Sequence, residues 1–319
     1  MVVIFSDNTD FTTSYVLYWM QYYGIRYIVV TPESKVIFTK FDNLVYTISI
    51  NGEQISSSTV KGVWYRRGEF SFERVKYKFA SKAHMLQSLI ESERQSCLFF
   101  FHKALEKCPV KIGSYFGNFI NRLDVLIEAE KIGLRIPKFI VTTSKSELTK
   151  FNLEHRKKGI ILKNFSQGVG FSIEERFYKY YTQKIDTAFI DSLPSEFAPS
   201  FFMEYFDTLF EIRAFVFLEQ VFSMAIISSY AAVDVKKKEQ LNQVRYAPYV
   251  LPKSISKSLI ELVKQLDIET GSVDLLVNKD GLFCFLEINP IGQFGHLSKV
   301  CNLYLEKLIA QYFYEKTRV

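Results

Sequence analysis

Residues 271–295 read GSVDLLVNKDGLFCFLEINPIGQFG and predict two strands joined by a turn. The alternation in SVDLLV and the apolar run LFCFLEI are both typical of strands. The segment NKDG between them ends in Asp-Gly, which is common in hairpin turns. A hairpin would lay the strands side by side with Asp274 facing Glu287. Asn289 would share the face of Glu287, because side chains alternate with a period of two.

These three side chains form a candidate metal site. Two carboxylates and an amide oxygen suit Mg²⁺, which takes few protein ligands and bridges nucleotide phosphates. An ordinary edge hairpin with solvated acids is the alternative, but acids inside apolar strands need a partner. We therefore expect Asp274, Glu287 and Asn289 to hold Mg²⁺.

Length and composition narrow the class of protein. The 319 residues predict two or three lobes, and the 48% hydrophobic fraction predicts a well-packed globular protein. A net charge of +6 does not indicate a protein that binds duplex nucleic acid. The four cysteines form no CxxC pair and the four histidines are scattered, so zinc and disulfides are not expected. No signal peptide and no apolar run of about 18 residues are visible, which favours a cytoplasmic protein without a membrane span.

The first part of the chain predicts a small doubly wound lobe. A strand, a helix ended by Gly24 and a second strand make a β-α-β start. A hairpin about Asn51-Gly52, a strand in VKGVWYRRGEF and a helix over about 81–107 follow. Pro109 and Gly113 then mark a boundary.

The rest of the chain alternates helices and strands without internal repeats. NFINRLDVLIEAEKIGL predicts an amphipathic helix that begins near Asn118 or Asn121 and ends at Gly133. EIRAFVFLEQVFSMAIISS predicts a strand, a bend at Glu219-Gln220 and another strand. SKSLIELVKQLDI and the C-terminal NLYLEKLIAQYFYEK both predict helices.

Two basic side chains lie on predicted strands. Lys163 ends the apolar strand GIILKNF and precedes the glycine turn SQGVG, whose amides can face phosphate; a solvated Lys at a strand end is the alternative. Arg213 follows Glu211 by two residues, and its planar guanidinium suits a phosphate or an acyl phosphate. Arg245 is a second candidate of the same kind.

An extended segment predicts a nucleotide hinge. Glu204, Tyr205 and Phe206 follow an apolar strand, and backbone groups there can bind an adenine edge. Glu211, seven residues after Glu204, can hold the ribose hydroxyls. A plain strand exit with a surface acid is the alternative for this motif alone.

These pieces occur in one order, and from about Asn118 onward the chain resembles the ATP-grasp ligases. The resemblance implies an ATP-grasp fold of mixed α+β and α/β class, with an N-terminal doubly wound α/β lobe at 1–115, a central lobe at 116–200 and a C-terminal lobe at 201–319. It implies that Lys163 contacts the α- and β-phosphates of ATP, that Glu204–Phe206 binds adenine and that Glu211 binds ribose. Asp274, Glu287 and Asn289 become the Mg²⁺ ligands. Arg122 stands where many members have an ATP-binding Lys.

A narrower resemblance covers almost the whole chain. VWYRRGEF, APSFFMEYFDTLFEIRAFVF, VRYAPYVLP and LEINPIGQFG together are similar to the microviridin-type graspetide ligases, and most of all to the peptide maturases of the grasp-with-spasm systems. That resemblance implies a ribosomal precursor peptide with a leader and an acidic core as substrate, and a homodimer. Arg66 and Arg67 match the Tyr-Arg-Arg segment of the family and are candidate substrate contacts; solvated basic residues at a strand end are the alternative. Gln243 replaces the acid that often lies two residues before the Arg of VRY.

The implied reaction is ligation through an acyl phosphate. A peptide carboxylate would attack the γ-phosphate of ATP while Mg²⁺, Lys163 and Arg213 meet the growing charge. A hydroxyl or amine of the same peptide would then attack, giving an ester with Thr or Ser or an amide with Lys. The turn after Lys163 is a candidate lid. A ligase that adds a free amino acid to an acidic peptide or metabolite, and an ATP-binding regulatory protein without turnover, are the alternatives.

Overall fold

The computed structural model describes residues 1–42, 45–72, 83–165, 170–173, 176–179, 182–228 and 244–318. The chain divides into two compact units. The first contains Met1–Phe119, Asp267–Thr270 and Pro290–Val319, and the second contains Ile120–Leu266 and Gly271–Asn289. The three lobes expected from the sequence stay a prediction. Within the described ranges, none of the helices is apolar over a stretch long enough to cross a membrane.

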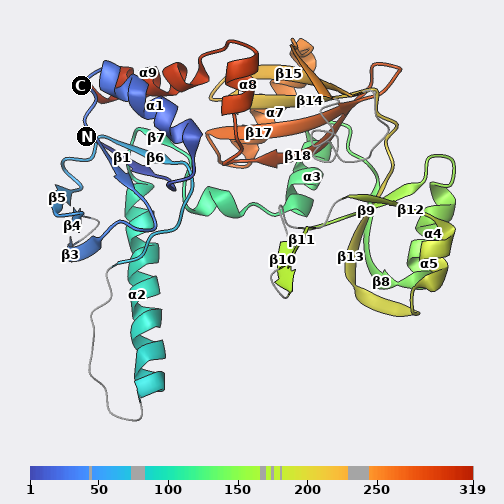
Figure 1. The fold of residues 1–319 in the computed structure, drawn as a ribbon, viewed down its shortest axis with the longest axis horizontal. Coiled ribbons are helices and arrows are strands. Elements are labelled where there is room, and N and C mark those ends of the chain that lie inside the picture. The colour runs from blue at the N-terminus through green and yellow to red at the C-terminus, as the bar shows by residue number, and fades with distance from the viewer. Residues whose placement is uncertain are drawn as a thin grey trace. The chain divides into compact units, whose positions relative to one another are not determined.

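The first unit contains a parallel sheet of order β2-β1-β6-β7. Its strands are β1 (Val2–Phe5), β2 (Tyr27–Val30), β6 (Gly62–Tyr65) and β7 (Lys111–Ile112). All residues of β1 and β6 are buried, which explains why both strands read as apolar runs without alternation. The helices of this unit are α1 (Phe11–Tyr22), α2 (Ala83–Leu105), the 3₁₀ helix η1 (Phe116–Phe119), α8 (Gly295–Val300) and α9 (Leu305–Thr317). Helix α1 lies beside α9 (Figure 1).

Local chemistry explains the start of the chain. Asp10 caps α1, because its carboxylate accepts a hydrogen bond of 3.1 Å from the amide of Thr12. Gly24 follows the helix at φ +67°, as a C-terminal glycine does. A separate antiparallel sheet contains β3 (Val36–Asp42), β4 (Val45–Ile50) and β5 (Glu53–Ser56). Asn51 and Gly52, both at positive φ, join β4 to β5 and confirm the predicted hairpin.

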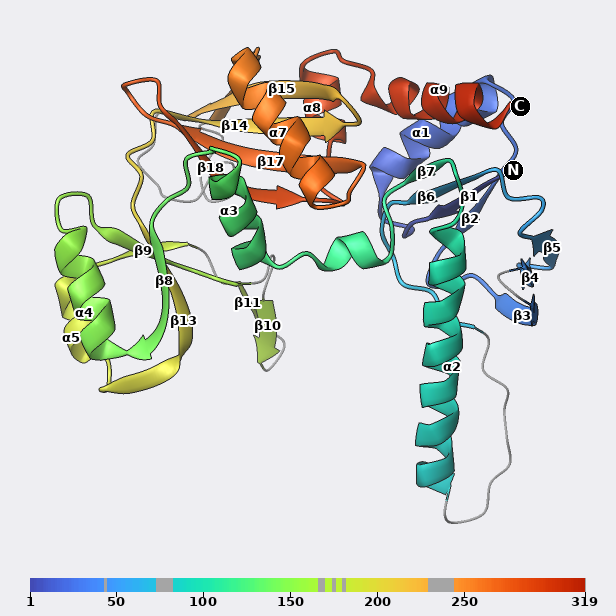
Figure 2. The same cartoon turned by 180° about the vertical axis from the view of Figure 1, so that it is seen from behind.

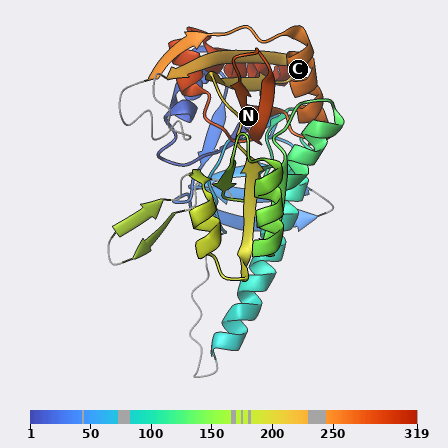
Figure 3. The same ribbon diagram turned by 90° about the vertical axis from the view of Figure 1, so that its right-hand side faces the viewer.

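One sheet of the second unit has the order β12-β9-β13-β8 and is antiparallel. Its strands are β8 (Phe139–Ser144), β9 (Ile160–Lys163), β12 (Gln183–Ile185) and β13 (Glu196–Glu204). Helices α4 (Lys145–Glu154) and α5 (Thr187–Ser192) lie side by side along it (Figure 3). Strands β10 (Gly170–Ile173) and β11 (Arg176–Lys179) pair with each other.

The other sheet of this unit has the order β16-β15-β14-β17-β18. Its strands are β14 (Phe210–Phe217), β15 (Gln220–Ser228), β16 (Val244–Pro248), β17 (Thr270–Val277) and β18 (Phe283–Asn289). Helix α7 (Lys253–Gln265) packs against β14 and β15, and α3 (Arg122–Lys131) packs against β18 (Figure 2). Asn121 caps α3 through bonds to the amides of Leu123 and Asp124, which decides between the two predicted starts of that helix.

Candidate functional site

The three expected metal ligands lie on one face of the hairpin β17–β18. Asp274 is directly opposite Glu287, and Asn289 is opposite Ser272, in the antiparallel register. A β-bulge follows, because Leu275 pairs with Phe285 and Leu286 is left over. The prediction that Asp274 faces Glu287 is confirmed.

The bulge separates the acids from the core. Without the extra residue, Glu287 would share a face with Phe285, two positions earlier. With it, Phe285 and Ile288 are both buried, at 1% and 4% exposure, while Glu287 points to the other face. Directly opposite side chains have their Cβ atoms about 4.5–5.5 Å apart. Two carboxylates and an amide on one face therefore match the oxygen ligands that Mg²⁺ prefers.

Two basic side chains converge on Glu287. Its Oε2 atom lies 2.6 Å from Nη2 of Arg122 and 3.1 Å from Nζ of Lys163. Arg122 also donates a hydrogen bond to the carbonyl oxygen of Asn164, immediately after Lys163. Helix α3, strand β9 and strand β18 thus each supply one member of this group. Lys163 is not a solvated strand-end residue, because its ammonium is mostly buried against this carboxylate.

Arg213 makes the matching contact with the other carboxylate. Its Nε and Nη2 atoms donate to the two oxygens of Asp274 at 2.9 and 3.3 Å, a bidentate pair. Strands β14 and β17 are neighbours in the sheet, so this contact follows from strand order. Three basic side chains therefore face two carboxylates, and they are chemically suited to exchange carboxylate for phosphate oxygens.

The hinge is attached to the sheet by two of its three amides. The amide of Glu204 donates to Lys138 O at 2.8 Å, and that of Tyr205 donates to Gly159 O at 2.9 Å. Within the described part of the chain, the amide of Phe206 makes no hydrogen bond. Of the three amides, that of Phe206 is therefore the one without a backbone partner among the described residues.

The side chains of the hinge have protein partners. Oε2 of Glu204 lies 3.3 Å from Nδ1 of His155, and the ammonium of Lys184 lies 4.1 Å from the ring centre of Tyr205. Burial, followed by the nearby charge of Asp207, raises the pKa of Tyr205. His155 and Lys184 thus hold the side chains of Glu204 and Tyr205.

Glu211 and Arg245 lie on different faces of the five-stranded sheet. Glu211 is opposite Ile226, which is opposite Tyr246, so Glu211 shares its face with Arg213. Arg245 is opposite Ile227 and points to the other face, where its side chain is exposed. The structure therefore brings Glu211 toward the site and does not bring Arg245 there. The candidate lid SQGVG lies at 166–170, mostly outside the described residues.

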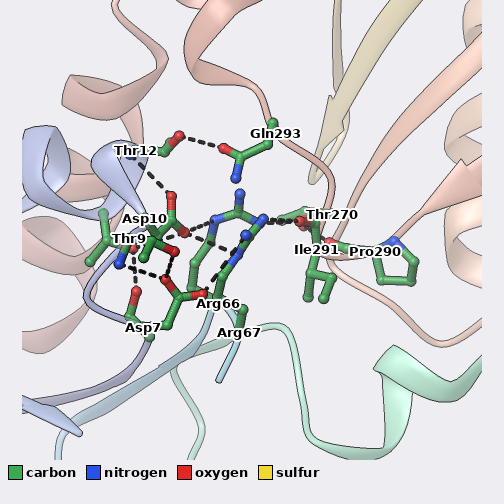
Figure 4. A network of polar contacts seen from close by, with 12 residues as sticks. Asp7, Thr9, Asp10, Thr12, Arg66, Arg67, Thr270, Pro290, Ile291 and Gln293 are labelled. Atoms are coloured by element: carbon green, nitrogen blue, oxygen red, sulfur yellow. Dashed lines mark hydrogen bonds and ion pairs between the residues drawn. The ribbon is translucent and has the colours of Figure 1, made fainter. Parts of the chain in front are cut away.

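In the first unit, Arg66 and Arg67 belong to a polar network (Figure 4). Arg66 is 3% exposed, and its Nε lies 3.0 Å from Oδ2 of Asp10, at ion-pair distance but without hydrogen-bond geometry among the described residues. The Nε of Arg67 lies 3.3 Å from the same oxygen. Both guanidinium groups also donate to the carbonyl oxygen of Ile291, and Arg66 stacks at 5.7 Å on Phe294.

This arrangement gives the two arginines different exposure. Burial lowers the pKa of Arg66 to about 10, against the raising effect of Asp10, so the group remains charged at neutral pH. Arg67 is partly exposed and also lies 3.8 Å from Asp7. Burial opposes but does not outweigh the hydrogen bonds from Thr9 and the charge of Arg67, so the pKa of Asp7 is lowered. Arg67 is therefore the member of the pair that can reach a ligand.

Sequence reasoning missed two kinds of residue. Ser272 lies opposite Asn289 on the face of the expected metal ligands, and its position two residues before Asp274 was a usable signal. Asp10 had no such signal, because its partner Arg66 is 56 residues away. Burial raises the pKa of the Cys284 thiol to about 12, which keeps it protonated at neutral pH.

Solved structures with low sequence identity share this fold along almost the whole chain. One is the macrocyclase MdnC from Microcystis aeruginosa MRC, bound with precursor peptide MdnA: 22% identity, 97% of this chain and 98% of that chain covered, TM-score 0.77. Another is a RiPP-associated ATP-grasp ligase from Chryseobacterium gregarium, in complex with ADP and a leader and core peptide: 22% identity, 99% and 96% covered, TM-score 0.80. The ATP-grasp ligase PsnB, complexed with minimal precursor, Mg and ADP, has 16% identity, 100% and 98% covered and a TM-score of 0.73.

No family model and no curated protein matches the sequence. The likeness to the three solved structures gives the chain the ATP-grasp fold, as the sequence predicted.

Proposed function

We propose that this chain is an ATP- and Mg²⁺-dependent ligase that joins side chains within a ribosomally made precursor peptide. In this proposal Asp or Glu side chains of the peptide core condense with its Thr, Ser or Lys side chains. The observation that carries the proposal is the convergence of Arg122 and Lys163 on Glu287 beside the pair Arg213–Asp274. The same fold carries precursor peptides, ADP and Mg in the solved structures described above.

Each member of the cluster has a role in the proposed reaction. Asp274, Glu287 and Asn289 would hold Mg²⁺, which draws charge from phosphate oxygens when it is bound. Lys163 and Arg122 would contact phosphates of ATP, and Glu211 would hold the ribose. The hinge at Glu204–Phe206 would bind adenine, with the amide of Phe206 as donor.

Arg213 would orient the reacting carboxylate. Its fork of donors grips two oxygens of Asp274 and would grip a substrate carboxylate or acyl phosphate in the same way. Attack of the peptide carboxylate on the γ-phosphorus releases ADP and leaves an acyl phosphate. Attack of the hydroxyl or amine on the acyl carbon releases phosphate and a proton, so one water is lost for each bond. Arg245 would act on the substrate only from the other face of the sheet, and Arg67 is the better-placed of the two arginines in the first unit.

The decisive experiment incubates the chain with ATP, Mg²⁺ and a small peptide encoded beside its gene. The expected result is a peptide that loses the mass of one water for each bond formed, together with one ADP. ADP formation that requires a free amino acid and leaves the peptide unlinked would overturn the proposal and favour an amino-acid ligase. Hydrolysis of each product in mild base separates esters from amides.

A matched pair of variants tests the cluster. Glu287→Gln should lower turnover by about 100-fold or more, because it removes a charge that holds Mg²⁺ and two basic groups. Glu219→Gln is the control, since Glu219 is an exposed glutamate paired with one lysine, Lys264, at 3.0 Å. Mg²⁺ binding measured by calorimetry in the presence of ADP should weaken in the first variant and remain in the second. Full activity of Glu287→Gln would refute the metal assignment.

The proposal also includes a second copy of this chain as a partner. The expected homodimer rests on the family resemblance of the sequence.

A further inference from the structure

Helix α1 exposes four aromatic rings along one face. Phe11 is 78% exposed, Tyr15 57%, Tyr18 66% and Tyr22 77%. Their spacing of four, three and four residues places them on one side of the helix. This set of four rings is called the aromatic stripe below.

The helix behind the stripe has no charged residue. Its sequence is FTTSYVLYWMQY, and its inner face buries Thr12, Thr13, Val16 and Met20. The outer face of a surface helix is normally charged or polar, and a contiguous exposed apolar surface marks an interaction site. The outer face of α1 therefore carries aromatic side chains where a solvated helix face normally carries charged or polar ones.

Packing holds one end of the stripe in place. Trp19 and Tyr23 contact the ring of Tyr22 at 5.7 and 5.4 Å, and Tyr23 contacts Tyr314 of α9 at 4.9 Å. The ammonium of Lys307 lies 5.2 Å over Trp19. Because α1 is anchored to α9, the stripe is a rigid platform that loses little conformational entropy on binding.

The order of the rings is symmetric about the middle of the helix. A spacing of four, three and four residues reads the same from either end. Two copies of α1 that cross antiparallel would therefore place Tyr15 of one copy against Tyr18 of the other, and Phe11 against Tyr22. A twofold interface requires this kind of self-complementary surface.

We propose that the aromatic stripe of α1 is the surface through which two copies of this chain pair. With roughly 200 Å² for each aromatic side chain, the exposed parts of the four rings amount to roughly 550 Å² on each copy. Complete burial of these rings in two copies would cover roughly 1,100 Å² at most, close to the roughly 1,000 Å² that a specific interface needs. The stripe is uncharged, so two copies meet without repulsion.

The absence of charge on α1 also favours a second copy of this chain over a membrane surface or the precursor peptide as the partner of the stripe. A helix that lies on a membrane surface carries Lys or Arg beside its apolar face, and α1 carries none. The expected precursor peptide has an acidic core, and the stripe offers no basic group to it. The proposed pairing does not depend on the ligase activity, because association and ATP turnover are measured separately.

Sedimentation velocity of the full chain over a range of concentrations tests the proposal. The wild type should sediment as a dimer, and the double variant Tyr15→Glu/Tyr18→Glu should weaken pairing by about 100-fold or more, because facing glutamates repel. Leu153→Glu on α4 is the control, since Leu153 is 59% exposed in the other unit. It should leave the dimer intact. A monomeric wild type at tens of micromolar, or a dimer that persists in the double variant, would overturn the proposal.

A charge-rescue experiment tests whether the aromatic stripe of one copy faces that of the other. Tyr15→Lys/Tyr18→Lys should be monomeric alone, as the glutamate variant should be. An equimolar mixture of the two should form heterodimers, because each glutamate then faces a lysine of the other copy. Circular dichroism of each variant confirms that it is folded. Two folded monomers that fail to associate when mixed would show that the stripe does not face itself.

Discussion

The substitution Asp10→Asn tests the polar network of the first unit. Asp10 has a fully buried carboxylate, and Arg66, its partner at 3.0 Å, is 3% exposed. Asn caps a helix as well as Asp does, so the substitution preserves the cap that Oδ1 makes with the amide of Thr12. It removes the charge and replaces Oδ2, which faces Arg66, by an amide nitrogen that can only donate. At an effective dielectric constant of about 20, a unit charge pair at 3.0 Å contributes about 5.5 kcal/mol of Coulomb energy.

Removal of the carboxylate also relieves the cost of burying it, so the net effect is smaller than the Coulomb energy. A buried guanidinium without its counter-charge costs about 3–5 kcal/mol. We expect the free energy of unfolding to fall by that amount. Urea unfolding followed by tryptophan fluorescence measures it, because Trp19 and Trp64 are the two tryptophans of the chain and both lie in the first unit.

A solvent-exposed ion pair provides the comparison. Arg26 and Glu53 are 2.5 Å apart but 74% and 41% exposed, so Glu53→Gln should cost less than about 1 kcal/mol. The double variant Asp10→Asn/Arg66→Met should lose less stability than the two single variants added together, because neither charge is left alone. A loss below about 1 kcal/mol for Asp10→Asn, or strict additivity, would refute the reasoning.

Two further predictions concern stability in the same unit. Burial lowers the pKa of His102 to about 4. Near pH 5 the unfolded chain therefore binds a proton at this histidine that the folded chain does not bind. The free energy of unfolding consequently falls as the pH falls from about 6.5 toward 4. The ring of His102 stacks on Tyr115, so Phe is a suitable replacement. Between pH 7 and pH 5, the free energy of unfolding measured in urea should fall by about 2 kcal/mol less in His102→Phe than in the wild type. Equal falls in the two proteins would contradict this. Gly68→Ala should destabilise the protein by at least about 1 kcal/mol more than Gly52→Ala. Both glycines have a positive φ, but a Cβ at Gly68 would lie 2.5 Å from a backbone oxygen, whereas a Cβ at Gly52 would have no atom within 4 Å. Equal melting temperatures would disprove the steric argument.

Much of the candidate site could be predicted because its signals are local. The alternation around Asp274 and the period of two between Glu287 and Asn289 place these side chains on one face before any packing is known. The same rule placed Glu211 and Arg213 together. The bulge at Leu286 was not predictable, because it depends on how Phe285 and Ile288 fit the core.

The sequence by itself determined the β-α-β start of the chain, the hairpin at Asn51-Gly52 and the face shared by the expected metal ligands, because capping, turn chemistry and periodicity act over a few residues. The tertiary structure decided the rest. It buried Arg66 against Asp10 and placed Arg245 on the opposite face from Arg213. These outcomes depend on contacts between segments far apart in the chain, where strand order and burial set the partner of each charge.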